Sequence, residues 1–333
     1  MADIGFGIIG LGRMGWLHAE HLNGPVRGAR LVAAAVDPEH RRRLLARGDA
    51  PCPLAPDAEA LLAEPGVEAL VIASSSSVHE EHIRLAAAAG KPVFSEKPLA
   101  DSVAKARAAA QVVSESGIPF QIGFQRRFDP GYVHAQALIA SGAIGEVEMF
   151  RGLTCDRIPP VSYLRNSGGL FWDLAIHDFD AARFLMGDEI AAVHAVGGVK
   201  VEPALAEFDD IDYGIATLRF RGGGLGVVQG SWRAPAGYDI RAEVHGSRGK
   251  VITEVDERYP TRLYTAQGRV SARHDEFVER FREAYLAELQ AFVDALRAGA
   301  TPSPGIADAL AAILVSDAAT RSRREDRWVE VDA

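Results

Sequence analysis

This sequence has little of what a membrane protein, a disulfide-stabilised protein or a nucleic-acid-binding protein requires. Only two cysteines, Cys52 and Cys155, occur in 333 residues, and neither has metal-ligand spacing. No apolar run approaches the ~18 residues that a membrane-spanning helix needs. Lysine and arginine number 36 against 45 aspartates and glutamates, and the net charge of −9 disfavours nucleic acid and anionic membranes as partners.

The N-terminal segment MADIGFGIIGLG also lacks the features of a secretory leader. It has no basic region before its apolar residues and no small-residue cleavage site. Together with the few cysteines, this predicts a cytoplasmic protein with reduced thiols. The length of 333 residues and the hydrophobic content of 48% allow two globular domains with a sizeable core.

Two patterns of hydrophobicity divide the chain near residue 124. Before it, short apolar runs alternate with helical segments, which is typical of βαβ units around a parallel sheet. After it, alternating apolar and polar residues between glycine turns predict an antiparallel sheet with one covered face. We expect two domains, residues 1–123 and 124–333, without a flexible linker. The expected strands are 4–10, 29–37, 67–74, 91–97, 119–124, 145–156, 191–201, 212–220, 224–232 and 238–247, and the expected helices are 14–23, 78–90, 101–117, 275–298 and 306–320.

A glycine-rich turn lies between the first expected strand and the first helix. Gly10, Gly12 and Gly15, with Arg13 and Met14 between the last two, form the pattern G-x-G-x-x-G. The first glycine permits a tight turn, the second lets the backbone approach a pyrophosphate, and the third lets helix and strand pack closely. Because a helix N-terminus also attracts negative charge, these five residues are predicted to bind a dinucleotide.

Asp37 ends the second expected strand, 22 residues after Gly15. An acid at this place would hold the ribose 2′-hydroxyl of NAD and repel the 2′-phosphate of NADP, so NAD is the predicted cofactor. Arg41, Arg42 and Arg43 follow shortly afterwards. We interpret them as the solvated face of the next helix, although an arginine there could also reach a phosphate.

Lys97 ends the run KPVFSEKP, at the carboxyl end of an expected parallel strand. Ligands of open parallel sheets bind at these ends, so the lysine is expected beside the nicotinamide; the alternative is a surface lysine in a turn. Ser74 either lines the cofactor or caps a helix, and His79 is open to the same two roles. His18 and His21 are interpreted as surface or packing residues, and no histidine–carboxylate cluster indicates a metal site.

The segment GGLFWDLAIHDFDAARFLMG, residues 168–187, is predicted to form a buried helix, yet it carries four ionisable side chains within a short stretch. At about 100° per residue, Asp173 and His177 lie one turn apart, and Asp180 joins the same face. Asp178 points the other way. Such a stripe is either a solvent-facing edge or the wall of a polar pocket.

Together these residues resemble the glucose-fructose oxidoreductase/inositol dehydrogenase family over nearly the whole chain. Gly10–Gly15, Asp37, the Glu96-Lys97-Pro98 triplet and Asp173…His177 carry the resemblance. It is closest to inositol 2-dehydrogenases through QIGFQRRFDP, IGEVE and SGGLFWDLAIHDFDAARFLMG (121–130, 144–148 and 167–187). It implies a Rossmann domain with a doubly wound parallel sheet, followed by an α/β domain with a large, mostly antiparallel sheet that often forms a tetramer interface.

The resemblance also implies which residues form the site. Lys97, Asp173 and His177 take the catalytic positions, and the stripe is then expected to face the cleft above the nicotinamide. Glu96 is expected at the cofactor together with the residues given above. The expected substrate contacts are Lys97, Arg127, Asp156, Asp173, His177, Asp180 and Tyr238.

These residue types suit the oxidation of a secondary hydroxyl with NAD. Histidine ionises near neutral pH, so His177 fits the base, and Asp173 would orient its imidazole. Lys97 would stabilise the reacting oxygen. The predicted activity is an NAD-dependent dehydrogenase of a cyclic polyol or sugar, with inositol as the leading substrate. The alternatives are a dehydrogenase or reductase of another pyranose and a non-catalytic nucleotide-binding regulator.

Two positions depart from inositol dehydrogenases. The family usually has Tyr-Gly-Tyr where this sequence has Ala236-Gly237-Tyr238, and it commonly has tyrosine where Phe281 stands. Both missing tyrosines are expected near the substrate. A cyclic polyol or pyranose other than myo-inositol is therefore an alternative substrate.

Overall fold

The computed structural model describes residues 2–254 and 257–332, which form two compact units. Unit 1 comprises Met1–Phe124 and Tyr285–Leu310, and unit 2 comprises Gln125–Ala284 and Ala311–Ala333. The sequence assigned every residue after 123 to the second domain. In the structure, a C-terminal segment instead packs within the first unit.

A parallel sheet of six strands forms the centre of unit 1, in the order β3-β2-β1-β4-β5-β6. Nearly every residue of β1, β4, β5 and β6 is buried, as expected where helices cover both faces. The order is that of a doubly wound dinucleotide-binding fold, which confirms the predicted Rossmann domain. The strands are β1 Ile4–Ile9, β2 Ala29–Ala35, β3 Leu54–Ala55, β4 Ala69–Ile72, β5 Val93–Ser95 and β6 Phe120–Ile122.

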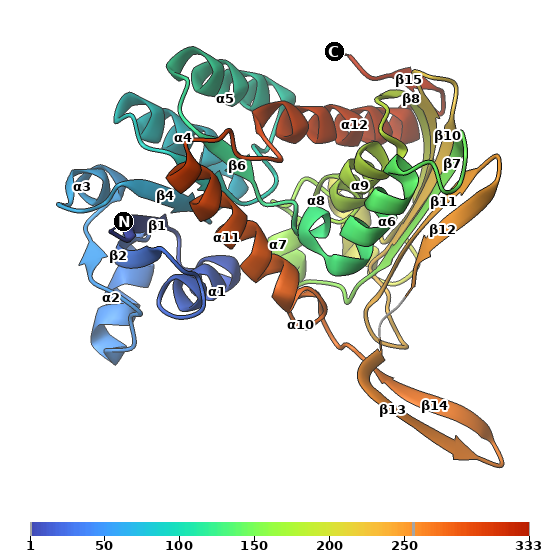
Figure 1. The fold of residues 1–333 in the computed structure, drawn as a ribbon, viewed down its shortest axis with the longest axis horizontal. Coiled ribbons are helices and arrows are strands. Elements are labelled where there is room, and N and C mark those ends of the chain that lie inside the picture. Colours follow the sequence, from blue (N-terminus) through green and yellow to red (C-terminus); the bar gives the residue numbers. More distant parts are fainter. Residues whose placement is uncertain (1, 255–256, 333) are drawn as a thin grey trace. The chain divides into compact units, whose positions relative to one another are not determined.

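Helices from both ends of the chain pack in unit 1 (Figure 1). The apolar face of α11 joins the core of the sheet, where the ring of Phe292 lies 6.1 Å from that of Phe6 and 6.0 Å from that of Phe94. This packing explains why the segment from Tyr285 belongs to the first unit. The helices are α1 Arg13–Leu22, α2 Pro38–Arg47, α3 Ala58–Ala63, η1 Ser76–Val78, α4 His79–Ala88, α5 Val103–Ser116 and α11 Arg282–Ala298.

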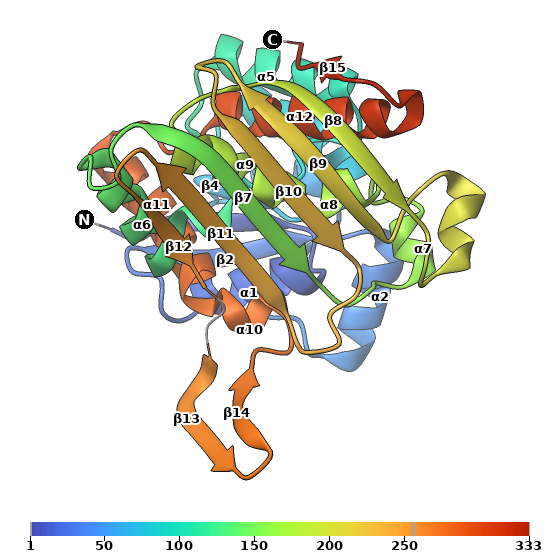
Figure 2. The same cartoon turned by 90° about the vertical axis from the view of Figure 1, so that its right-hand side faces the viewer.

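Unit 2 is built on a seven-stranded sheet in the order β12-β11-β7-β10-β9-β8-β15. Only β7 and β10 pair in parallel, so the sheet is mostly antiparallel, as predicted. A separate hairpin of β13 and β14 extends from it (Figure 2). The strands are β7 Val147–Cys155, β8 Ile190–Gly198, β9 Tyr213–Phe220, β10 Leu225–Ser231, β11 Asp239–Gly246, β12 Gly249–Thr253, β13 Glu257–Thr265, β14 Gly268–Arg273 and β15 Val329–Glu330.

Helices cover one face of this sheet, and strands β9, β10 and β11 alternate buried and exposed residues accordingly. The core includes Phe150 and Phe220 from the strands, Phe179 from α9 and Val315 from α12. No helix in the described part of the chain is long and apolar enough to cross a membrane. The helices are η2 Gln125–Phe128, α6 Pro130–Ala140, α7 Val161–Leu164, α8 Leu170–Asp173, α9 Ile176–Met186, η3 Pro203–Phe208, α10 Phe277–Arg280 and α12 Ile306–Glu325.

Candidate active site

The glycine turn between β1 and α1 has the shape that a dinucleotide requires. Gly10 has φ +94°, and a Cβ there would lie 2.5 Å from the carbonyl oxygen of Ala73, while one at Gly15 would lie 1.9 Å from the carbonyl oxygen of Gly10. A Cβ at Gly12 would meet nothing within 4 Å. Gly12 is the N-cap of α1, no side chain caps the helix, and its first turn, Arg13 and Met14 included, holds no acid. Its N–H groups therefore suit an anionic pyrophosphate.

Asp37 lies just after β2, at the same edge of the sheet, and caps α2. Its Oδ1 accepts a hydrogen bond from the backbone N–H of His40 at 2.9 Å. This is a structural role that the sequence analysis did not predict. A ribose hydroxyl would have to bind a carboxylate that already holds a helix end, so the residue would serve both purposes.

His79 is buried at the start of α4, and its ring contacts the loops after β4 and β5. Its Nδ1 lies 2.8 Å from the carbonyl oxygen of Pro98 and its Nε2 lies 3.0 Å from that of Ser74. Burial lowers the pKa of His79, which favours a neutral ring with a single N–H. We assign that N–H to Nδ1, which makes the shorter contact. The Ser74 hydroxyl pairs with Nδ1 of His82 at 3.0 Å.

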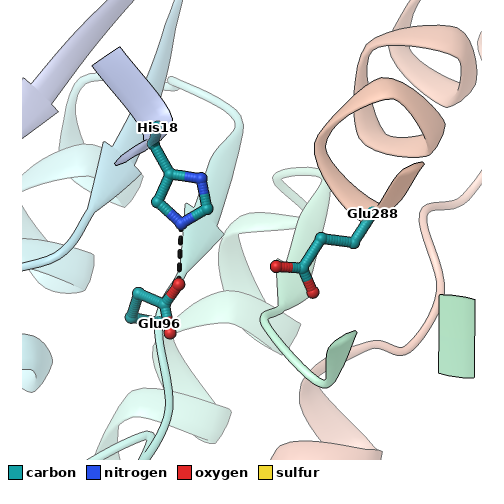
Figure 3. A group of neighbouring side chains, drawn as sticks. All are labelled: His18, Glu96 and Glu288. Carbon is teal, nitrogen blue, oxygen red and sulfur yellow. Dashed lines mark hydrogen bonds and ion pairs between the residues drawn. The ribbon is translucent and has the colours of Figure 1, made fainter. Parts of the chain in front are cut away.

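Glu96 follows β5 and joins a buried cluster that the sequence did not predict (Figure 3). His18 donates from Nε2 to Glu96 Oε1 at 2.7 Å, and Glu288 of α11 lies beside them. His18 and Glu288 are fully buried, and His21 is 6% exposed. His18 and His21 are therefore interior residues, which settles the choice between surface and packing. A histidine–carboxylate cluster does exist, and the sequence could not predict it because Glu288 comes from a distant helix.

Lys97 stands between Glu96 and Pro98 and is half-buried. The backbone N–H of Glu96 donates to the carbonyl oxygen of Ile72 at 2.8 Å, so the chain is still bound to β4 immediately before the lysine. Residues at the ends of β1, β2, β4 and β5 thus share the carboxyl edge of the sheet, where such folds bind ligands.

The segment 168–187 of unit 2 does not form the continuous helix that was predicted. Helix α8 ends at Asp173, and α9 begins at Ile176. Between them, the backbone N–H groups of Leu174 and Ala175 both donate to the carbonyl oxygen of Leu170, which interrupts the regular helical pattern. The prediction that Asp173, His177 and Asp180 share one face of a continuous helix is therefore wrong in detail. Asp173 is buried on α8, and the half-buried His177 lies in the first turn of α9.

Asp178 and Arg126 form a buried ion pair that the sequence did not predict. Arg126 Nη1 donates to Asp178 Oδ1 at 2.7 Å, and the Thr154 hydroxyl donates to Oδ2 at 2.8 Å. Burial opposes the charged form of Arg126, but Asp178 holds the pKa of the guanidinium above its ordinary value. The pair fixes η2 against α9 and β7. The sequence did contain a signal for this pairing. The two arginines of QRRF pair with the two aspartates of HDFD, Arg126 with Asp178 and Arg127 with Asp180.

Arg127 and Asp180 were both predicted to contact substrate, and the structure pairs them with each other. Arg127 donates from Nε and Nη2 to the two oxygens of Asp180 at 2.9 and 2.7 Å. Asp180 is 1% exposed, and Arg183 lies 3.7 Å from one of its oxygens. Its carboxylate is therefore largely engaged by arginines, which leaves Arg127 as the more exposed member of the pair.

Tyr238 and Phe281 are buried and pack edge to face, with ring centroids 6.2 Å apart. Ala236, two residues earlier, is exposed. Asp156 follows β7 and is half-buried, and its backbone N–H binds the carbonyl oxygen of Ser231 at 3.0 Å. The two positions that depart from the family thus differ in setting, because one is open to solvent and the other is enclosed.

Both units match profiles of known protein families. Residues 4–124 match the NAD-binding Rossmann fold of the GFO/IDH/MocA oxidoreductase family, and residues 136–331 match its C-terminal alpha/beta domain.

Individual relatives align over almost the entire chain. One is scyllo-inositol 2-dehydrogenase (NAD(+)) of Bacillus subtilis, 37% identical over 326 residues, which cover 98% of this chain and 95% of that protein. Another is inositol 2-dehydrogenase of Rhizobium meliloti, 38% identical over 328 residues and 98% of each chain. Among solved structures, scyllo-inositol dehydrogenase from Lactobacillus casei with bound NAD(H) and scyllo-inositol has a TM-score of 0.91 at 29% identity, over 99% of this chain and 100% of that one.

Proposed function

Because this chain belongs to the GFO/IDH/MocA family of NAD-binding oxidoreductases, we propose that it oxidises a secondary hydroxyl of an inositol or a related cyclic polyol. The observation that carries the proposal is the gathering of the open glycine turn, Asp37, Ser74 and Lys97 at one edge of the parallel sheet. A regulator that only binds nucleotide has no need of a lysine there, or of a histidine with a neighbouring aspartate.

The residues at this edge fit NAD. The uncapped start of α1 would hold the pyrophosphate, and the free space at Gly12 would let the backbone approach it. Asp37 would accept a hydrogen bond from the ribose. Bound NAD supplies the hydride acceptor.

The protein's own side chains manage the proton of the substrate. His177 would accept the hydroxyl proton at an imidazole nitrogen, and Asp173 would orient the ring and stabilise its charged form. Lys97 would donate a hydrogen bond to the oxygen as negative charge develops on it. Arg127, Asp156, Asp180 and Tyr238 are proposed to bind the remaining hydroxyls, with the Arg127–Asp180 pair presenting mainly the arginine.

We propose scyllo-inositol as the first substrate to test and myo-inositol as a poorer one. The B. subtilis relative is named for scyllo-inositol, and the L. casei structure contains it. The missing tyrosine hydroxyls at Ala236 and Phe281 remove two expected partners of ring hydroxyls, and each buried hydroxyl without a partner costs about 1–3 kcal/mol, which argues for a ring with fewer hydroxyls than an inositol as the alternative. Another pyranose remains the second candidate.

We also propose a homo-oligomer, a tetramer or a dimer, in the cytoplasm. Figure 2 views the face of the unit 2 sheet opposite its helices. Val196 and Ile215 are cross-strand partners in this sheet, and their side chains are 50% and 43% exposed. Exposed apolar side chains that neighbour one another on a sheet favour association. A sedimentation measurement that gives the mass of one chain would contradict it.

The test of the function is a panel of scyllo-inositol, myo-inositol, other cyclic polyols and aldoses, each with NAD and with NADP. Formation of reduced nicotinamide is followed by its absorbance. The proposal predicts the highest kcat/KM for an inositol with NAD. Preference for an aldose, or for NADP, would favour the alternative sugar dehydrogenase, and nucleotide binding without turnover of any ring would favour the regulator.

A further inference from the structure

The cluster of His18, Glu96 and Glu288 contains buried acceptors that lack donors. In a neutral His18 ring whose Nε2–H donates to Glu96, Nδ1 is an acceptor, and it has no partner among the described residues. Neither carboxylate oxygen of Glu288 has one, nor does Oε1 of Gln121, whose Nε2 binds the backbone carbonyl of Glu288 at 2.8 Å. Buried polar groups are nearly always hydrogen-bonded, so the cluster needs at least one additional donor.

The two carboxylates also require compensation of charge. One side-chain nitrogen or oxygen from each of His18, Glu96 and Glu288 lies within 4.8 Å of the others. Figure 3 shows the Glu288 carboxylate turned toward the His18–Glu96 pair. Glu288 is fully buried and Glu96 is 7% exposed. Two carboxylates this close and this buried repel each other when both are ionised, which favours a proton on one of them or a cation beside them.

The geometry favours a proton over a metal ion. His18 Nε2 and Glu96 Oε1 are 2.7 Å apart, which is a hydrogen-bond distance. Two ligands with bonds of about 2.0–2.1 Å to one ion lie about 3.3 Å apart in tetrahedral geometry and about 2.9 Å apart in octahedral geometry. These two atoms are therefore too close to be ligands of a common ion.

We propose that Glu288 is a neutral carboxylic acid that shares its proton with Glu96, and that this carboxyl pair positions Lys97. The inference rests on the proposed catalytic role of Lys97. One proton on Glu288 leaves a single negative charge on the pair, which the N–H of His18 stabilises. The proposal involves only the hydrogen bond between the carboxyl groups of Glu288 and Glu96. No covalent bond forms or breaks, and Glu288 does not touch the substrate.

The position of Lys97 depends on its two neighbours in the chain. Glu96 is held by its backbone bond to Ile72 and by His18, and the carbonyl of Pro98 is held by His79. Glu96 Oε2 lies 3.3 Å from the place where a Cβ on Gly123 would stand, so that the absence of a side chain there leaves room for this carboxylate.

His18, His21 and His79 lie around the carboxyl pair. His18 contacts Glu96 directly, and the ring of His21 lies 6.3 Å from that of His18. His79 senses the charge of both Glu96 and Lys97. A change in the proton shared with Glu288 would therefore alter the surroundings of the lysine and shift the pH dependence of turnover.

Infrared spectroscopy of the intact protein at pH 7 in D₂O tests the proton directly. We expect the carbonyl band of a protonated carboxyl group, which shifts on ¹³C-glutamate labelling and disappears in Glu288→Gln. Absence of that band in the folded wild-type protein would overturn the proposal, as would one equivalent of bound metal in elemental analysis. This readout does not depend on turnover, so the proton assignment is tested even if the proposed dehydrogenase activity fails.

Kinetics then test the positioning role. Glu288→Gln keeps a neutral donor and should retain kcat near the wild-type value at pH 7, with its alkaline limb altered, whereas Glu288→Ala should lose about tenfold in kcat with a smaller change in the KM for NAD. Leu289→Ala is the matched control, because it removes a fully buried side chain next to Glu288 in α11. It should lower stability and leave the pH profile unchanged. Equal losses in Glu288→Gln and Glu288→Ala, or an unchanged profile in both, would contradict the positioning role.

Discussion

Arg127 and Asp180 bind each other through two parallel hydrogen bonds, from Nε at 2.9 Å and from Nη2 at 2.7 Å. Arg127 comes from the short helix that opens unit 2, and Asp180 lies on α9, so the pair joins segments 53 positions apart. Asp180 is nearly inaccessible, with an exposed fraction of 1%. The pair therefore has a structural task in addition to any contact with substrate.

Removal of the arginine should destabilise the protein strongly. Arg127→Ala leaves a buried carboxylate without its main partner, and the expected loss is about 3 kcal/mol in the free energy of unfolding. Arg157→Ala breaks the exposed pair with Asp275, at 3.0 Å, and should cost less than about 1 kcal/mol. Urea denaturation of both variants at pH 7 gives the comparison, and similar small losses would contradict the structural role.

Cofactor selectivity should depend on the negative charge of Asp37 and not on its role as the N-cap of α2. We expect the wild type to favour NAD over NADP by at least about tenfold in kcat/KM, or about 1.4 kcal/mol. Asp37→Ser keeps a side chain that can cap α2 but removes the charge, so the preference should fall while the Tm changes little. Asp57→Ser alters the equivalent cap of α3 and should leave selectivity unchanged. Equal use of both cofactors by the wild type would refute the assignment.

Catalysis should require Lys97 and His177 separately. Each alanine variant is expected to bind NAD normally and to lose about 10²–10⁴-fold in kcat, the usual contribution of a positioned acid or base. Lys250→Ala is the control, because this exposed lysine binds Glu243 in the sheet of unit 2. Turnover at the wild-type rate in either active-site variant would remove that residue from the mechanism.

Substrate preference should respond mainly to position 236. Ala236 is exposed and can accept a tyrosine, whereas Phe281 is fully buried against Tyr238, so a hydroxyl there needs a new buried partner. Ala236→Tyr should raise kcat/KM for myo-inositol relative to the better substrate, and Phe281→Tyr should add less. If the wild type already prefers myo-inositol to every other ring, these departures do not determine specificity.

The protonated Glu288 should make the free energy of unfolding depend on pH. Burial, with the charge of Glu96, raises the pKa of Glu288 well above its ordinary value of 4.5. A carboxyl group with a raised pKa contributes stability that is complete below the ordinary value and is lost as pH rises through the folded value. Between the two, the free energy of unfolding of the wild type should fall relative to Glu288→Gln, by at most about 1.4 kcal/mol per pH unit. Parallel curves for the two proteins would contradict this.

The sequence predicted those features that local chemistry determines. Gly10 and Gly15 need positions without a side chain, and both the turn and the strand–helix alternation around it were confirmed. The alternation of buried and exposed residues likewise predicted the mostly antiparallel sheet. The short strand β3 was missed because two residues show no periodicity.

Long-range pairings could not be read in the same way. Glu288 lies in the stretch AELQAF, where a glutamate would be taken for a solvated residue, and only the packing of α11 on the parallel sheet brings it to Glu96. The break in the helix between Asp173 and Ile176 could not be predicted either, since every residue there is compatible with a helix.

The most direct test of the account is the initial rate of NAD reduction by the wild-type protein with scyllo-inositol, measured beside His177→Ala under the same conditions. The account predicts steady formation of reduced nicotinamide by the wild type and a loss of at least about a hundredfold in the variant, with NAD affinity retained. No reduction by the wild type with any inositol, while NAD binds normally, would contradict it.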